Sequence, residues 1–334
     1  MSDNIIVICL LLVVGLVLII KGGDYFVDGA SWLAEVSGIP KFIVGATIVS
    51  VATTLPEIVV SLISVKSSPD MAIGNAVGSV VFNAGVIMAI ALIASPFIIK
   101  RKDYAFKGLL LTGVMALLFA FSLFGMDSNK ISLSTNGLFG YVGSAVLLVL
   151  FIVFIVENVI SAKKNALESQ DEEKPVANKK SVTINLLKLI LGAAAIGGGA
   201  ILLKDNAEQL AIKLGLSKAL IGVTILAIGT SLPELVTMII AVKKGQASLS
   251  IGNIIGANTI DLAIILPFSA FIAGGSGLPV SGLHLFITMP VTLAIIAIGI
   301  IPTLIFKKFT RTQGVMMFAI YLAYFVFNIV YVLA

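Results

Sequence analysis

Cysteine, histidine and charged residues are scarce in this chain. Cys9 and His284 are the only residues of their kinds among 334, and charged residues make up 12% of the sequence. A single cysteine excludes an intrachain disulfide and a thiolate metal cluster, and one histidine leaves little imidazole for zinc or copper. So small a share of charges lies far outside the composition of a soluble globular domain. The composition therefore indicates a membrane protein.

Apolar sequence is abundant instead, since hydrophobic residues make up 59% of the chain. A spanning helix needs about 20 mostly apolar residues. Ten stretches are candidates, near residues 4–24, 42–65, 71–97, 104–125, 138–160, 182–204, 219–242, 248–274, 281–306 and 313–333. No Lys or Arg precedes the first stretch and no small-residue cleavage site follows it, so we expect a retained helix rather than a signal peptide. We predict an all-α, multi-pass protein of the cell membrane.

The basic residues predict the orientation of these spans. Most of the 22 Lys and Arg residues fall on one side when the ten spans are threaded through a bilayer in turn. Because cytoplasmic loops carry the excess of Lys and Arg, both termini are predicted outside and the loop at 161–181 in the cytoplasm. Topology thus explains the formal charge of +5, and we expect no nucleic-acid partner. Glu157 is interpreted as an interfacial anchor within reach of Lys163 and Lys164.

One unusual sequence occurs twice. Residues 45–57 read GATIVSVATTLPE, and residues 222–234 read GVTILAIGTSLPE. The triplet IGN at 73–75 also recurs, at 251–253. Self-similarity of this kind indicates that the chain is a duplication.

The duplication divides the chain into two halves and a linker. The predicted domains are a first five-helix repeat at 1–160 with its motif at 45–83, a charged linker at 161–181, and a second five-helix repeat at 182–334 with its motif at 222–261. Because five is an odd number, the second repeat must cross the bilayer in the opposite sense. Inverted repeats with helices broken at the midplane are typical of many secondary transporters. We therefore predict ten transmembrane helices in two inverted five-helix repeats.

Each repeated motif places a carboxylate beside a proline inside an apolar stretch. Glu57 follows Pro56, and Glu234 follows Pro233. Inserting an ionisable side chain into a membrane costs roughly 2.5 to 3.5 kcal/mol on insertion scales, so each acid marks a functional site. A proline leaves carbonyls of the preceding turn without partners, and a bound cation can satisfy them. The alternative is that these prolines only kink the helices for packing.

Polar side chains recur at helical spacing on four of the predicted spans. They are Ser50, Thr53, Thr54, Glu57, Ser61 and Ser64 on the second, Asn75, Ser79 and Asn83 on the third, Thr224, Thr230, Ser231, Glu234 and Thr237 on the seventh, and Asn253, Asn258 and Asp261 on the eighth. These ligands offer only oxygen from carboxylate, amide and hydroxyl groups, which suits hard cations such as Ca²⁺ and Na⁺. Gly74, Gly78, Gly252 and Gly256 are spaced to let helices approach closely.

These motifs resemble the α-repeats of the sodium/calcium exchanger family, within the calcium/cation antiporter superfamily. The resemblance covers nearly the whole chain and is most specific at GTSLPE (229–234) and GNIIGANTID (252–261). It implies that Glu57 and Glu234 are the central Ca²⁺ ligands, with Na⁺ at overlapping positions. It further implies a site completed by Thr53, Thr54, Thr230, Ser231, Ser79, Asn83 and Asp261, to which we add Ser50 from the polar face of its span.

Two positions depart from the family pattern. Ala257 stands where the family usually has Ser, which removes the hydroxyl that would match Ser79 and puts one Na⁺ position in doubt. Val80 stands where the first repeat often has Asn, although its counterpart Asn258 is present.

The resulting hypothesis is a secondary antiporter that exchanges Na⁺ for Ca²⁺ by alternating access, with the two cations competing for one midplane site. The long first and sixth spans are implied by the resemblance as the moving element. A Ca²⁺/H⁺ exchanger of the same superfamily is the nearest alternative, kept open by Ala257, and K⁺ dependence also stays open. The expected partners are the transported ions and the lipid bilayer, with no cofactor and no obligatory protein partner.

Two other classes of protein fit less well. An intramembrane protease would need a His-Glu-x-x-His or Gly-x-Gly-Asp motif, or a Ser–His dyad, and the sequence has none of these. We therefore expect no enzymatic activity. A channel would conduct without a counter-ion, and the duplicated closed site argues against one.

Overall fold

The computed structural model describes residues 4–65, 69–124, 133, 136–168, 178–214 and 227–333. Its helices in the first half are α1 (Ile5–Ser37), α2 (Lys41–Val44), α3 (Ser50–Ser64), α4 (Pro69–Phe82), α5 (Ala89–Ala94), α6 (Arg101–Ser122) and α7 (Tyr141–Glu168). In the second half they are α8 (Lys179–Lys213), α10 (Ala227–Thr230), α11 (Leu232–Lys243), α12 (Ala247–Ile260), α13 (Leu266–Ala273), α14 (Met289–Phe306) and α15 (Arg311–Leu333). The π-helical turns are η1 (Gly45–Val49), η2 (Asn83–Met88), η4 (Asp261–Ile265) and η5 (His284–Thr288).

Eight helical stretches of the described residues are long and apolar enough to cross a membrane. They are Ile5–Ser37, Ala72–Ala94, Asp103–Ser122, Tyr141–Leu167, Lys179–Lys213, Ala247–Ala273, His284–Phe306 and Arg311–Tyr331. The predicted second span includes the shorter apolar helix Lys41–Leu55, and α3 continues from it to Ser64. The first part of the predicted seventh span lies outside the described residues, and α11, which forms most of the rest, has 12 residues. Both of these segments carry the repeated polar motif.

The helical fold predicted from the sequence is accompanied by two short strands outside the spans. Strand β1 (Gly137–Gly140) pairs antiparallel with β2 (Gly277–Val280), and an isolated antiparallel bridge joins Ile98 to Lys308. Ile98 and β2 each follow the third span of their own half, whereas β1 and Lys308 each precede the fifth. The two pairings therefore connect equivalent places in the two halves.

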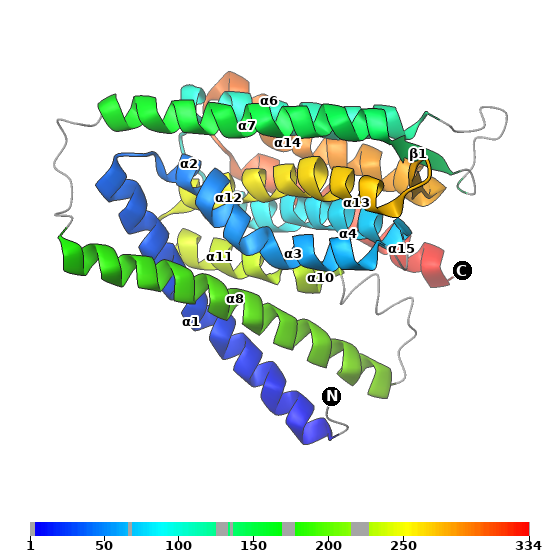
Figure 1. Ribbon diagram of the computed structural model, residues 1–334, viewed down its shortest axis with the longest axis horizontal. Coiled ribbons are helices and arrows are strands. Elements are labelled where there is room, and N and C mark those ends of the chain that lie inside the picture. Colours follow the sequence, from blue (N-terminus) through cyan, green and yellow to red (C-terminus); the bar gives the residue numbers. More distant parts are fainter. Residues whose placement is uncertain are drawn as a thin grey trace.

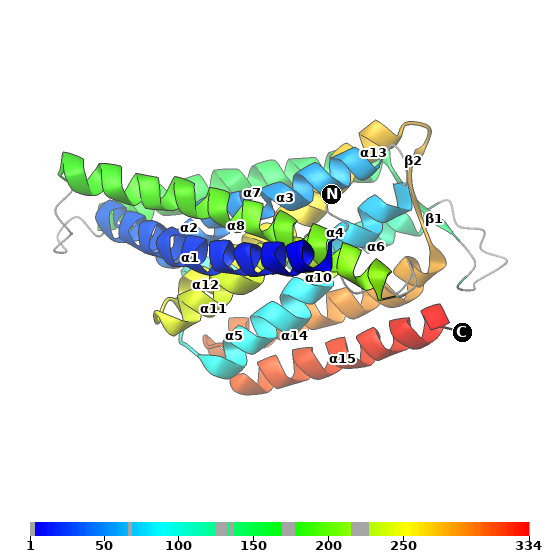
Figure 2. The same cartoon turned by 90° about the horizontal axis from the view of Figure 1, so that it is seen from below.

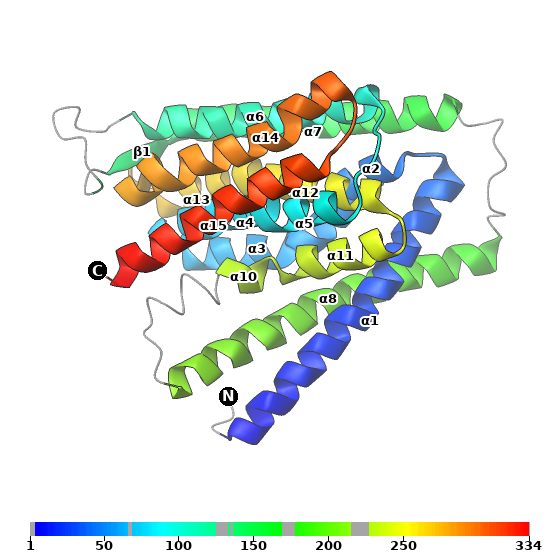
Figure 3. The same cartoon turned by 180° about the vertical axis from the view of Figure 1, so that it is seen from behind.

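The spans form a bundle in which two central elements are largely covered by the others (Figure 1). The buried share of the apolar window is 78% for Ala72–Ala94 and 83% for Ala247–Ala273, against 44% or less for every other span. Helices α14 and α15 cover one face of this centre, with α15 against α5 and η2 (Figure 3). These central spans carry the third and eighth polar faces, so the candidate site lies in the interior.

Helices α1 and α8 pack along each other at the opposite face of the bundle (Figure 2). Glycines make this contact close: a Cβ on Gly15 would lie 2.9 Å from the Gly199 carbonyl oxygen, and one on Gly192 would lie 2.7 Å from the Gly22 carbonyl oxygen. Small residues permit such backbone approach in a bilayer, where packing rather than the hydrophobic effect drives helix association. The two long helices therefore associate as a pair beside the central spans.

Glycines also allow α12 to pack closely against the start of the first repeated motif. A Cβ on Gly252 would collide with the Phe42 carbonyl oxygen, and one on Gly256 would lie 2.6 Å from the Ala46 carbonyl oxygen. A Cβ on Gly78, by contrast, would meet no atom within 4 Å. The predicted close approach is thus found at Gly252 and Gly256 and not at Gly78.

We expect Gly252→Ala to destabilise the protein, because overpacking a tight contact costs about 1–3 kcal/mol. Gly78→Ala is the matched control, since it adds the same methyl group to open space and favours the helix by up to about 1 kcal/mol. Thermal unfolding of the purified protein in detergent should show a lower midpoint for Gly252→Ala alone. Equal midpoints for the two variants would contradict the packing described here.

Candidate functional site

The two repeated acids come from α3 and α11, and both are fully buried. Helix α11 begins after a turn at Ser231, with Pro233 in its first turn, so this proline does mark a break. Helix α3 instead continues through Pro56, and the irregular turn of the first half lies earlier, at η1. The expectation of a proline-broken helix therefore holds in the second half only.

Each carboxylate is held by a hydroxyl from the other half of the chain. Ser231 Oγ donates to Glu57 Oε1 over 3.0 Å, and Thr54 Oγ1 donates to Glu234 Oε1 over 3.3 Å. These residues occupy matching places in the two motifs, so the two bonds are reciprocal. The arrangement brings the two acids together from segments that are far apart in sequence.

A second reciprocal pair of hydrogen bonds flanks the first. Thr53 Oγ1 donates to Asn253 Oδ1 over 3.1 Å, and Thr230 Oγ1 donates to Asn75 Oδ1 over 3.3 Å. Thr230 Oγ1 also lies 3.4 Å from Ser79 Oγ. The four polar faces predicted from the sequence therefore converge on one cluster.

Several oxygen atoms of this cluster are buried without a hydrogen-bond partner among the described residues. They are Glu57 Oε2, Glu234 Oε2, Asn83 Oδ1 and both carboxylate oxygens of Asp261. Leaving a buried acceptor unsatisfied costs about 1–3 kcal/mol, and more when the group is charged. Glu57, Glu234 and Asp261 are all fully buried, and carboxylates that share one site repel one another when they are ionised. A cation bound among these oxygens would relieve both costs.

The chemistry of the possible ligand atoms indicates which kind of cation would bind. The unpartnered oxygens belong to carboxylate and amide groups, which suit hard cations such as Ca²⁺ and Na⁺. No group of three or more His, Cys, Asp or Glu side chains arranged to hold a metal occurs in the described part of the chain. Neutral hydroxyl and amide oxygens would therefore have to complete the coordination around the acids.

The remaining predicted residues occupy distinct places. Asn83 and Asp261 are the first residues of the π-helical turns η2 and η4. Such turns are rare and are frequent at functional sites. Ser50 donates to the Thr47 carbonyl oxygen over 3.0 Å and lies against Gly256 at the contact between α3 and α12. Ser50 is therefore placed at a helix contact rather than with the unpartnered oxygens.

The predicted ligand set omits three asparagines that the structure brings into the cluster. Asn75 and Asn253 accept the threonine hydrogen bonds described above, and the recurring triplet IGN was the signal that could have identified them. Asn258 accepts a hydrogen bond from Asn83 Nδ2 over 3.0 Å. Repeat comparison gives no signal for Asn258, because Val80 is its counterpart.

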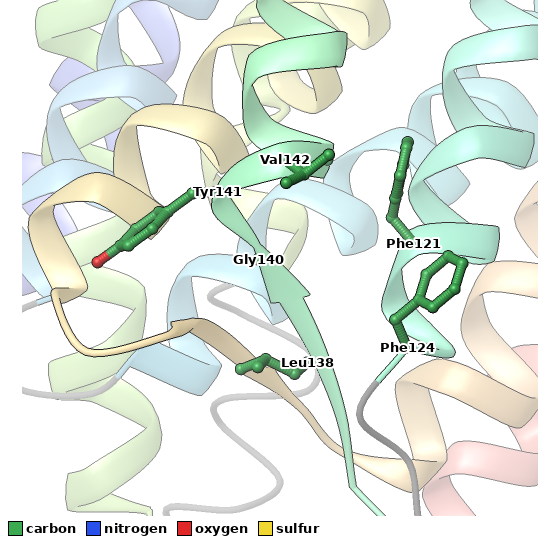
Figure 4. Close-up of a pocket in the computed structure, with 7 residues that line it drawn as sticks. Phe121, Phe124, Leu138, Gly140, Tyr141 and Val142 are labelled. Carbon is green, nitrogen blue, oxygen red and sulfur yellow. The ribbon is translucent and has the colours of Figure 1, made fainter.

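The structure also has an apolar pocket of about 500 Å³ (Figure 4). It is lined by Phe121, Phe124, Leu138, Gly140, Tyr141, Val142 and Gly143, at the ends of α6 and α7 beside β1. None of the predicted ligands lines it. Its size therefore does not identify it as the place where a hard cation binds.

Comparison with known proteins identifies the family of this chain. The family model described as sodium/calcium exchanger protein matches residues 7–159 and 184–330. An uncharacterized membrane protein of Methanocaldococcus jannaschii is 31% identical over 92% of this chain and 93% of its own length. The sodium/calcium exchanger MaX1 of Methanosarcina acetivorans is 29% identical over 95% and 97% of the two chains.

A solved structure extends the comparison to three dimensions. The sodium-calcium exchanger NCX_Mj, soaked with Na⁺ and Ca²⁺, superposes with a TM-score of 0.79 at 27% identity, covering 96% of this chain and 98% of that one. The family model matches in both halves and spans most of the sequence. The chain therefore belongs to the sodium/calcium exchanger protein family of multi-pass membrane transporters.

Proposed function

We propose that this protein is a secondary antiporter that exchanges Na⁺ for Ca²⁺ at the cluster around Glu57 and Glu234. The observation that carries the proposal is the pair of buried acids, each held through one oxygen by the other half and each leaving its second oxygen unpartnered. The exchangers named among its relatives support the choice of ions.

Exchange follows from competition for shared oxygens. One Ca²⁺ or more than one Na⁺ can neutralise the acids, but a common set of ligands does not accommodate both at full occupancy. An empty site would carry uncompensated charge across the dry barrier, which is costly in a membrane. Since a ligand shifts a conformational equilibrium only through its differential affinity for the two states, cation binding would permit the crossing.

The proposal includes ten crossings in two inverted repeats. Its support is the matching of features between the halves: the reciprocal hydrogen bonds, the π-helical turns that begin at Asn83 and Asp261, and the pairings β1–β2 and Ile98–Lys308. Inverted repeats place the two halves of a transporter site at the midplane. The pair α1 and α8 is the proposed moving element.

The proposed orientation has both termini outside and the linker at 161–181 in the cytoplasm. Its support is the distribution of basic residues under the positive-inside rule. The end of α7 and the start of α8 also lie at the opposite end of the bundle from the C-terminus (Figure 1).

Ion flux into proteoliposomes tests the function directly. We expect an outward Na⁺ gradient to drive ⁴⁵Ca²⁺ uptake when pH is clamped equal on both sides, because the two cations compete for one site. Replacing internal Na⁺ with choline should abolish the uptake, and a K⁺ series run in parallel reports K⁺ dependence. Ca²⁺ uptake that does not depend on Na⁺ and is driven by a pH gradient instead would overturn the assignment of Na⁺ as the counter-ion.

A Ca²⁺/H⁺ exchanger is the second candidate, favoured by one observation. Ala257, the counterpart of Ser79, is fully buried and adds no side-chain oxygen to the site. The Thr53 side of the cluster therefore lacks a neutral ligand of the kind that Ser79 supplies on the Thr230 side. The same flux experiment, driven by a pH gradient in the absence of Na⁺, distinguishes the two functions.

A further inference from the structure

The two halves of the cluster differ at two positions one helical turn apart. Asn83 in the first half corresponds to Asp261 in the second, and Val80 in the first half corresponds to Asn258 in the second. Asn258 therefore has no equivalent in the first repeat. Because the reciprocal hydrogen bonds do not include Asn258, its presence in the cluster calls for a separate explanation.

Asn258 is joined by a side-chain hydrogen bond to Asn83, one of the predicted ligands. Asn83 Nδ2 donates to Asn258 Oδ1 over 3.0 Å, and the exposed fractions of the two residues are 0% and 1%. An amide carries its donor and its acceptor on the same carbon. Fixing Asn83 Nδ2 against Asn258 therefore fixes where Asn83 Oδ1 points, and this oxygen is one of the buried unpartnered acceptors.

The orientation of this amide has an electrostatic consequence. A cation is attracted by the amide oxygen and repelled by the NH₂ group. Flipping the Asn83 amide, which exchanges Oδ1 and Nδ2, would therefore replace a ligand by a repulsive group. Groups outside the ligand shell that orient a ligand typically change metal affinity by 10–100-fold when they are removed. Asn83 is also the first residue of the turn η2, and its counterpart Asp261 is the first residue of η4. In both halves, the residue at this position therefore begins a π-helical turn.

We propose that Asn258 is a positioning residue, which holds the Asn83 amide so that its oxygen faces the transported cation. This inference rests on the proposed function for the identity of the cation. It assigns Asn258 a role through Asn83 rather than direct contact with the ion. The competing explanation is an ordinary hydrogen bond between membrane helices, which would stabilise the packing of α12 without changing cation affinity.

A double-mutant cycle separates these explanations. Calorimetric titration of Ca²⁺ into the full-length protein in Na⁺-free detergent gives the dissociation constants of wild type, Asn83→Ala, Asn258→Val and the double variant. Val is chosen because the first repeat has it at this place. We expect Asn83→Ala and Asn258→Val each to weaken binding about tenfold, and the double variant to be no weaker than Asn83→Ala, because the second change acts only through the first.

Two further variants complete the design. Asn258→Thr has nearly the shape of the Val variant but keeps an acceptor oxygen, so it should recover part of the lost affinity. Thr259→Val alters the neighbouring residue of α12, whose hydroxyl donates locally to the Ile255 carbonyl oxygen, and it should leave the affinity unchanged. If Asn258→Val does not fold, the cycle is run with Asn258→Thr, which should lower affinity modestly in the wild-type background and not at all beside Asn83→Ala.

Either of two results would overturn the proposal. Wild-type affinity in Asn258→Val would show that the amide needs no anchor. Losses that multiply in the double variant would show that Asn258 acts independently of Asn83. Because the titration measures binding without a gradient, Ca²⁺ affinities that follow the cycle remain informative even if Na⁺-driven uptake is absent, in which case the proposed function fails and the positioning role stands.

Discussion

Glu57→Gln and Glu234→Gln are each expected to reduce Na⁺-driven Ca²⁺ uptake by about 100-fold or more, because the affinity of an oxygen site for Ca²⁺ depends strongly on its count of charged ligands. Gln keeps the size of the side chain and an oxygen that can accept the hydroxyl bond from Ser231 or Thr54. The protein should therefore remain folded while the site loses one negative charge. Initial rates of ⁴⁵Ca²⁺ uptake into proteoliposomes measure the effect.

Glu35→Gln is the control for this experiment. Glu35 makes an exposed ion pair with Lys41, with 2.7 Å between Glu35 Oε1 and Lys41 Nζ, and it lies outside the cluster. Its uptake rate should match wild type. Near-normal uptake by both repeat variants, with monodisperse elution from a sizing column, would rule out the assignment of Glu57 and Glu234.

Lys107→Met is expected to cause the largest loss of stability. Lys107 is fully buried in α6, its Nζ lies 2.6 Å from Glu157 Oε2 of α7, and the same Nζ donates to the Asp103 carbonyl oxygen over 3.2 Å. Removing one partner of a buried ion pair leaves an uncompensated charge, which typically costs 3–5 kcal/mol, so we expect a loss of about that size. The midpoint of thermal or denaturant unfolding in detergent measures it.

The double variant Lys107→Met/Glu157→Gln should recover most of the lost stability, because it removes the second charge as well. Lys41→Met, which breaks the exposed pair with Glu35, should cost less than about 1 kcal/mol. Should Lys107→Met cost no more than Lys41→Met, the pair between α6 and α7 would have no structural importance.

The ion pair of Glu157 was not predictable from the sequence. Glu157 was expected to lie within reach of Lys163 and Lys164, which are its neighbours on the same helix. The structure pairs it with Lys107 instead, and Ser161 Oγ donates to its other oxygen over 2.7 Å. Hydrophobicity and spacing identify neighbours along one helix, but they do not identify which second helix packs against it.

The sequence said more about the polar faces of the candidate site than about this ion pair. Helical spacing identified the polar faces on which Thr53, Glu57 and Asn83 lie, and the structure brings these faces together. Ser50 shares the spacing of its span yet faces Gly256, because periodicity defines a broad face and not the direction of each side chain within it.

The sequence by itself determined that this is a multi-pass membrane protein in which one motif occurs twice, each time with a glutamate that the structure buries. These properties are local, since apolar composition, repeated motifs and helical spacing can be read within single segments. Only the tertiary structure decided that Ser231 holds Glu57, that Thr54 holds Glu234, and that Asn258 meets Asn83. Those partners lie more than a hundred residues apart, and helix packing, which depends on small residues at contacts such as that of Gly252 with Phe42, sets which of them meet.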